Sequence, residues 1–166
     1  MLEILKFPDP RLKEVSKPVT RFDAELHELL RQMVGTMYGA NGIGLAAPQV
    51  AKTIRAFVID LTGVEGEEKK LYEFINPVLR DGEGKITFEE GCLSVPEFVD
   101  EVDRKRVVTV DYQDRFGEPK TLRAEGLLAV AIQHENDHLD GILFVDRLSP
   151  LKRRLVKRQL MKAVTL

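Results

Sequence analysis

The spacing of apolar positions changes along the chain, and these changes predict its elements. Between positions 22 and 37 they recur every three or four residues, the period of one helix face, and Asp23 can cap that helix. His27 lies on the other side of the helix, which predicts a solvated surface histidine. The recurring apolar residues are Phe22, Leu26, Leu29, Leu30, Met33 and Met37.

Extended patterns flank this helix. Asn76-Pro77 is expected to close one strand, and the turn residues at 114–117 are expected to join the last two strands into a hairpin. The predicted strands span residues 2–6, 55–60, 71–75, 85–90, 107–112 and 120–124.

The densest apolar run, residues 127–132, predicts a helix buried in a core. The run is too short to cross a bilayer, and Gly141 is placed to end the helix in the left-handed conformation. Because strands precede this helix instead of alternating with helices, the order predicts an α+β fold. Mixed or antiparallel strands are expected to pack around a central buried helix, with a further helix at the C-terminus.

The C-terminal segment, residues 148–166, predicts a basic helix with Ser149 at its N-cap and Pro150 at its first position. A basic face is usually only solvated, and the alternative is contact with a polyanion such as a ribosome. The expected buried stripe is Leu151, Leu155, Leu160 and Val164. The basic residues are Lys152, Arg153, Arg154, Lys157, Arg158 and Lys162.

Composition predicts one globular domain over residues 1–166. With 43% hydrophobic and 31% charged residues, the chain can build a core and a solvated surface. A net charge of −2 gives no general signal for DNA binding. No signal peptide or membrane-spanning run is recognisable. Cys92 is the single cysteine, so no internal disulfide can form, and a cytoplasmic location is expected.

The candidate chemistry lies at the end of the apolar run, in His134-Glu135-x-x-His138. Residues four apart share a helix face, so both imidazoles can reach one metal ion, and Glu135 can reach water at that ion. The bare pattern equally suits polar residues on an exposed helix face. A buried helix favours the metal, because buried histidines need partners.

A catalytic metal site usually has three protein ligands, so the two histidines need one more. No histidine or cysteine follows His138, and the later acids are Asp140 and Asp146. Cys92 lies upstream, and a thiolate binds late first-row divalent metals well. A buried cysteine that packs as a small apolar residue is the alternative. The glycine-rich segment 39–50 either connects a helix to a strand or places Gln49 beside a substrate.

Taken together, three segments resemble one family, the peptide deformylases. They are Gly-Ile-Gly-Leu-Ala-Ala-Pro-Gln at 42–49, Glu-Gly-Cys-Leu-Ser at 90–94, and the histidine segment at 133–141. Their order and spacing are similar to the family's over nearly the whole chain. The resemblance implies an enzyme that removes the formyl group from the N-terminal formyl-methionine of nascent polypeptides and releases formate.

The resemblance also implies roles for single residues. Cys92, His134 and His138 would bind the metal, and Glu135 would be the general base. The family's ion is usually Fe²⁺, with Zn²⁺, Ni²⁺ or Co²⁺ as substitutes, although these ligands would suit zinc at least as well.

Further roles follow from the same resemblance. The Leu93 backbone N–H and the Gln49 side-chain amide would stabilise the oxyanion. Arg104 and Asp137 would support the site. The residues implied to contact the substrate are Ile43, Gly44, Leu127, Val130 and Ala131.

The chain departs from the family pattern at Asn41, where members often have an acid, and near Val99, where some have an arginine or an aromatic residue. Two other functions fit parts of the sequence. A zinc endopeptidase would use the same helix, but the upstream cysteine argues against it. An inactive relative would bind nascent chains or ribosomes through the basic tail, but it would be free to lose the site residues that this chain retains.

Overall fold

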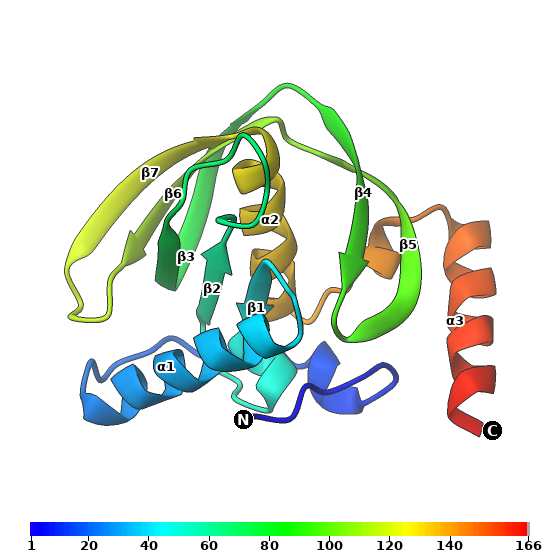
Figure 1. Cartoon of the computed structure of the whole chain (residues 1–166). Helices are drawn as coiled ribbons and strands as arrows, with labels where there is room; N and C mark the ends of the chain where they lie inside the picture. Colours follow the sequence, from blue (N-terminus) through cyan, green and yellow to red (C-terminus); the bar gives the residue numbers. More distant parts are fainter. Residues whose placement is uncertain (166) are drawn as a thin grey trace.

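The structure, a computed structural model, describes residues 1–165, with side chains through residue 162 (Figure 1). Strands come before the central helix, and the expected α+β class is confirmed. No helix within the described residues is long and apolar enough to span a membrane. The elements are η1 Pro10–Lys13, α1 Ala24–Gly39, β1 Gly44–Ala46, η2 Ala47–Val50, β2 Ala56–Asp60, β3 Leu71–Glu83, β4 Ile86–Cys92, β5 Val95–Arg104, β6 Val107–Gln113, β7 Pro119–Glu125, α2 Gly126–Leu139, η3 Phe144–Arg147 and α3 Pro150–Thr165.

The larger sheet is antiparallel, in the order β1-β2-β3-β6-β7. Successive side chains of β2 point to opposite faces, and both faces are covered. Phe57 and Ile59 pack in one core cluster with Ile132 of α2, whereas Ala56 and Val58 pack in a second cluster with α1. The unbroken apolar run of β2 therefore reflects burial on both sides.

The expected first helix is confirmed as α1. The Asp23 side chain accepts a hydrogen bond from the Leu26 backbone N–H, and the predicted apolar face is buried on the sheet. The prediction for His27 was wrong. Its ring is partly buried, its Nε2 lies 2.8 Å from the Arg115 carbonyl oxygen, and it packs edge-on against Phe116.

The prediction that Asn76-Pro77 closes a strand was also wrong, because β3 continues to Glu83. Asn76 adopts a left-handed conformation with φ of 52° at an irregularity in the pairing of β3 with β6. Its side chain exchanges hydrogen bonds with the Val19 backbone and donates to Gln113. Pro77 therefore lies in a bulge within β3, where its missing N–H is tolerated.

A second sheet consists of β4 and β5, which pair with each other and with no other described strand (Figure 1). The predicted strand at 85–90 is the start of β4, whereas β5 has no counterpart in the sequence prediction. Cys92 pairs with Val95, so Leu93 and Ser94 form the turn. Helix α2 stands between this hairpin and the larger sheet.

The N-terminal residues form no strand, contrary to the prediction for residues 2–6. Instead, single hydrogen bonds attach this arm to several elements. The backbone N–H of Leu5 donates to the Gln49 carbonyl, that of Phe7 to the Ser94 carbonyl, and that of Ser16 to the Leu139 carbonyl. The arm therefore touches the ends of the segments that carry the candidate site.

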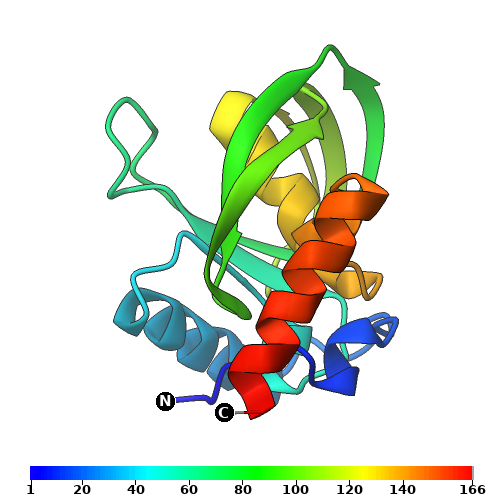
Figure 2. The same cartoon turned by 90° about the vertical axis from the view of Figure 1, so that its right-hand side faces the viewer.

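The predicted C-terminal helix is confirmed as α3, and the Ser149 hydroxyl accepts from the Lys152 N–H as its N-cap. It packs on the outer side of β5 (Figure 2). Its predicted buried stripe was wrong at Leu151 and Leu155, which are 60% and 53% exposed, whereas Leu160 is partly buried as predicted and the unpredicted Val156 is buried. The fourth predicted member, Val164, lies outside the described side chains.

Helix α2 ends as predicted, with Gly141 in the left-handed conformation at φ of 74°. A Cβ at this position would overlap the Lys13 carbonyl oxygen. Gly141→Ala is therefore expected to lower the free energy of unfolding in urea by roughly 2 kcal/mol or more.

The matched control is Gly35→Ala on the exposed face of α1, where an added Cβ meets nothing within 4 Å. This change is expected to stabilise the protein by roughly 0.5–1 kcal/mol, because alanine loses less conformational freedom in a helix. Equal effects of the two substitutions would contradict the account of Gly141.

Candidate metal centre

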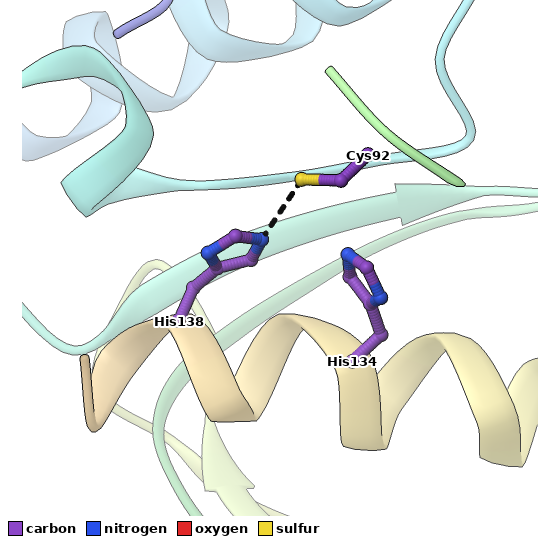
Figure 3. Close-up of side chains that lie close together, drawn as sticks. All are labelled: Cys92, His134 and His138. Carbon is purple, nitrogen blue, oxygen red and sulfur yellow. Dashed lines mark hydrogen bonds between the residues drawn. The ribbon is translucent and has the colours of Figure 1, made fainter. Parts of the chain in front are cut away.

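Three possible ligands converge from two elements. His134 and His138 point from successive turns of α2 toward the thiol of Cys92 at the end of β4 (Figure 3). One ligand atom from each lies within 4.8 Å of the others, and both histidines are buried. The structure thus brings together the three residues that the sequence singled out as metal ligands.

The spacing of these atoms suits a shared ion. A sulfur and a nitrogen bound tetrahedrally to one zinc-sized ion lie about 3.6 Å apart. Here Cys92 Sγ and His138 Nε2 are 3.4 Å apart. Burial holds the pKa of the His138 imidazole well below its ordinary value, so the ring is neutral, as a metal ligand must be. Donor types, spacing and the neutral His138 ring therefore fit a divalent ion.

Buried charges orient the second histidine. Glu90 Oε1 lies 2.8 Å from His134 Nδ1, which leaves Nε2 as the ligand nitrogen. Arg104 binds Glu90 through Nε and Nη2, at 2.8 and 2.9 Å, and Asp137 through Nη1 at 2.7 Å. Arg147 adds two hydrogen bonds to Asp137. The predicted supports, Arg104 and Asp137, therefore contact the site through Glu90.

The same contacts set the charges of the network. Burial raises the pKa of Glu90, but hydrogen bonds from Arg104 and His134 outweigh burial and lower it overall. Burial lowers the pKa of Arg104, but the hydrogen bonds of its guanidinium to Glu90 outweigh burial and raise the pKa overall. Burial likewise lowers the pKa of His134, while hydrogen bonds to Cys92 and Glu90 raise it well above its usual range. Binding of a metal ion would therefore release a proton from His134.

Glu135 follows the first histidine and is itself buried. Burial raises the pKa of its carboxyl to about 7. Its Oε1 has no hydrogen-bond partner among the described residues, and its Oε2 lies so close to Gly44 that a Cβ there would overlap it. A buried acid with a free oxygen and a pKa near neutrality is suited to accept a proton from a bound water.

Gln49 and Leu93 approach the ligands from the other side. The Gln49 Oε1 accepts from the Ala46 N–H at 2.9 Å, which points its amide nitrogen toward the thiol. That nitrogen lies 3.5 Å from Cys92 Sγ and 3.1 Å from Ser94 Oγ. Leu93 belongs to the turn between β4 and β5, directly after the candidate ligand.

A cavity of about 630 Å³ opens beside these residues. All five predicted substrate contacts line it: Ile43, Gly44, Leu127, Val130 and Ala131. Sequence reasoning missed Phe88, Glu90 and Lys6 as lining residues. Strand alternation was an available signal for Phe88, since positions 88, 90 and 92 of β4 share one face. For Lys6 the sequence contains no comparable signal.

An HExxH helix, an upstream thiol and a buried acid beside a largely apolar cavity are typical of a metal-dependent hydrolase. Comparisons identify the family. A model described as polypeptide deformylase matches residues 1–154. The peptide deformylase of Wolinella succinogenes is 51% identical over 98% of this chain and 96% of its own length, and that of Rhizobium meliloti is 49% identical over 96% and 92%.

A solved structure supports the same family. The crystal structure of a peptide deformylase from Legionella pneumophila matches with a TM-score of 0.90 and 47% identity, covering 99% of this chain and 96% of that one. The chain belongs to the peptide deformylase family. It is therefore a metal-dependent hydrolase that removes the N-formyl group from formyl-methionine at the start of nascent polypeptides and releases formate.

The raised pKa of Glu135 predicts a pH dependence for the metal-free protein. Folding raises the pKa from 4.5 to about 7, so the folded state loses stability as the pH rises through this window. Glu135→Gln removes the titration. The variant should match the wild type near pH 4.5 and exceed its free energy of unfolding by roughly 3 kcal/mol at pH 8.

Urea unfolding at several pH values, with chelator and a thiol reductant present, measures this difference. The same substitution at the exposed Glu65 serves as the control and should leave the pH dependence unchanged. Parallel stability curves for Glu135→Gln and wild type would contradict the assignment of a raised pKa.

Proposed function

We propose that Cys92, His134 and His138 hold the single catalytic ion and that Glu135 is the general base. The observation that carries this proposal is the position of Glu135, buried beside the three ligands with a raised pKa and an unpartnered oxygen. An ion held there would supply Lewis acidity, which would lower the pKa of a water and polarise the formyl oxygen. Glu135 would accept the proton of the attacking water and later donate it to the leaving amine.

Gln49 and Leu93 are proposed to stabilise the oxyanion that forms at the formyl carbon. The Gln49 amide nitrogen already lies beside the Cys92 thiol, and the Leu93 N–H follows it along the chain. In the described structure the Gln49 nitrogen donates to Ser94. Ser94 therefore keeps the amide directed toward the site until an oxyanion accepts from it.

The cavity is proposed to take the methionine side chain of the substrate. Ile43, Leu127, Val130 and Ala131 provide apolar wall, and Phe88 adds an aromatic surface that was not anticipated. Gly44 has a main-chain edge beside Glu135, where an extended peptide can pair with it. A formyl carbon carries only hydrogen, so close packing of Gly44 on Glu135 leaves little room for bulkier acyl groups.

We propose Fe²⁺ as the ion in the cell, with Zn²⁺, Ni²⁺ or Co²⁺ able to replace it. A thiolate with two imidazoles accepts each of these ions, so the donor set alone does not choose among them. A thiolate ligand requires a reduced Cys92, which supports a cytoplasmic location. The whole chain is proposed to act as one catalytic domain.

The decisive measurement is formate release from formyl-Met-Ala-Ser by protein purified without oxygen. Chelation should abolish release and Fe²⁺ should restore it. Glu135→Gln should lower kcat about 10³-fold while metal content and fold are retained, because the ion and its ligands remain but the base is lost.

Glu65→Gln, an exposed change of the same kind, should leave turnover unchanged. Activity of Glu135→Gln within tenfold of the wild type would overturn the proposed base. Exposure to air should inactivate the iron form but not the zinc form. Equal loss of activity in both forms would argue against oxidation at an iron–thiolate centre.

We also propose that α3 contacts the ribosome. Arg154 and Arg158 are exposed on this helix, next to the exposed side chains of Leu151 and Leu155. The helix thus presents a surface that combines positive charge with apolar area, which suits an RNA–protein assembly. The net charge of −2 supplies no reason to propose DNA as a specific partner.

The double variant Arg154→Gln/Arg158→Gln tests this contact better than removal of the helix, because Val156 is buried and deletion would open the core. Ribosome affinity should fall, and the negative slope of log K against log salt should become shallower by about 1.5–2. Formate release should not change. An unaltered slope, or an equal effect of the control Lys52→Gln/Lys69→Gln in two exposed loops, would reject the proposal.

A further inference from the structure

Gln49 and Leu93 belong to separate parts of the fold. Gln49 lies in η2, which directly follows β1 of the larger sheet, and Leu93 lies in the turn of the β4–β5 hairpin. No described strand pairs this hairpin with the larger sheet. A hairpin of two strands is marginally stable by itself. Sheet hydrogen bonds therefore do not set the distance between the two groups proposed to stabilise the oxyanion.

Residues 5–7, here called the N-terminal strap, connect both sides. The Leu5 N–H donates to the Gln49 carbonyl at 2.7 Å, and the Phe7 N–H donates to the Ser94 carbonyl at 2.8 Å. Between them, the Lys6 ammonium donates to the Leu93 carbonyl at 2.9 Å. Three consecutive residues thus hold the main chain at Gln49 and at the hairpin turn.

The turn between β4 and β5 accepts two of these hydrogen bonds through its carbonyls. Cys92 pairs with Val95, so the carbonyls of Leu93 and Ser94 have no place in the hairpin ladder. Ser94 is buried, so its carbonyl requires a partner, which the Phe7 N–H supplies, and the Lys6 ammonium donates to the Leu93 carbonyl at an exposed position. Because adjacent peptide planes share a Cα, holding the Leu93 carbonyl also restricts the direction of the Leu93 N–H. Gly42 leaves room for the Leu93 side chain, since a Cβ at Gly42 would overlap the Leu93 Cδ1 atom.

We infer that the N-terminal strap sets the relative positions of Gln49 and Leu93 and that Lys6 is a positioning residue for deformylation. The inference rests on the proposed oxyanion roles of those two residues. Lys6 holds the turn through its ammonium and takes no part in proton transfer. Its removal lowers the rate of the chemical step and leaves metal binding and substrate binding intact.

Lys6 also lines the cavity mouth, so direct contact with the substrate is the competing explanation. A lysine that binds the peptide would pair with its C-terminal carboxylate. That role would appear in KM, and only for peptides that end in a carboxylate. The test therefore uses formyl-Met-Ala-Ser in both the carboxylate and the amide form.

Lys6→Met removes the ammonium and keeps an unbranched stem, and Lys6→Arg keeps a cationic donor. Lys13→Met is the matched control, because Lys13 belongs to the same arm but pairs with Asp146 outside the site. Lys6→Met should lower kcat about tenfold for both peptides, with KM within about twofold and metal content unchanged. Lys6→Arg should recover most of the rate, and Lys13→Met should match the wild type.

Backbone and side-chain amide NMR spectra of the zinc-loaded protein supply a readout independent of turnover. In Lys6→Met the signals of the Leu93 N–H and the Gln49 side-chain amide should shift, and in Lys13→Met they should not. Unchanged kcat with unshifted signals would overturn the inference. So would a rise in KM confined to the carboxylate peptide. Absence of formate release by the wild type would instead reject the proposed function. The amide spectra would still test whether Lys6 sets the positions of Leu93 and Gln49.

Discussion

The buried ion pairs of Arg104 hold the functional half of the molecule together. Arg104 ends β5, Glu90 lies on β4, and Asp137 lies on α2, so one guanidinium joins the small hairpin to the central helix. Breaking such a pair leaves an uncompensated buried charge, which costs about 3–5 kcal/mol. The hairpin has no sheet partner elsewhere in the described structure, so this contact acts together with the apolar packing of Val95 and Val102 to hold it beside α2. Glu90 in turn fixes the orientation of the His134 ring through its contact with Nδ1.

Close main-chain approach is the second constraint on the site. Gly44 lies against the Glu135 carboxylate, Gly42 against Leu93, and Gly91 against Val99 of the paired strand. At Gly44 a Cβ would overlap the Glu135 carboxylate, and at Gly42 it would overlap the Leu93 side chain. The acid is thereby packed against backbone, which removes water from it and raises its pKa. The close approaches at Gly42 and Gly44 explain why the first motif segment has glycine at these two positions.

Local patterns predicted the parts of the fold in which periodicity and burial agree. Helices α1 and α2 and the β6–β7 hairpin follow from apolar spacing, caps and turn residues. The prediction failed where distant contacts override local signals. β3 continues past Pro77 because the Asn76 side chain makes hydrogen bonds at the bulge, to the Val19 carbonyl and to Gln113. β5 was not predicted because its apolar residues are sparse and its partner is the acidic strand β4. The Lys6 contact joins residues 87 positions apart, and no pattern in the chain indicates it.

The N-terminal arm explains how motif segments so far apart in sequence form one site. Its donors reach Gln49, the turn after Cys92, and Leu139 at the end of α2. At that end, Gly141 fits against the Lys13 carbonyl, where no larger residue can sit. Each motif segment thus accepts a hydrogen bond from the N-terminal arm, and these contacts form only in the folded chain. An ion that binds Cys92, His134 and His138 selects this folded state, so metal binding and assembly of the site stabilise each other.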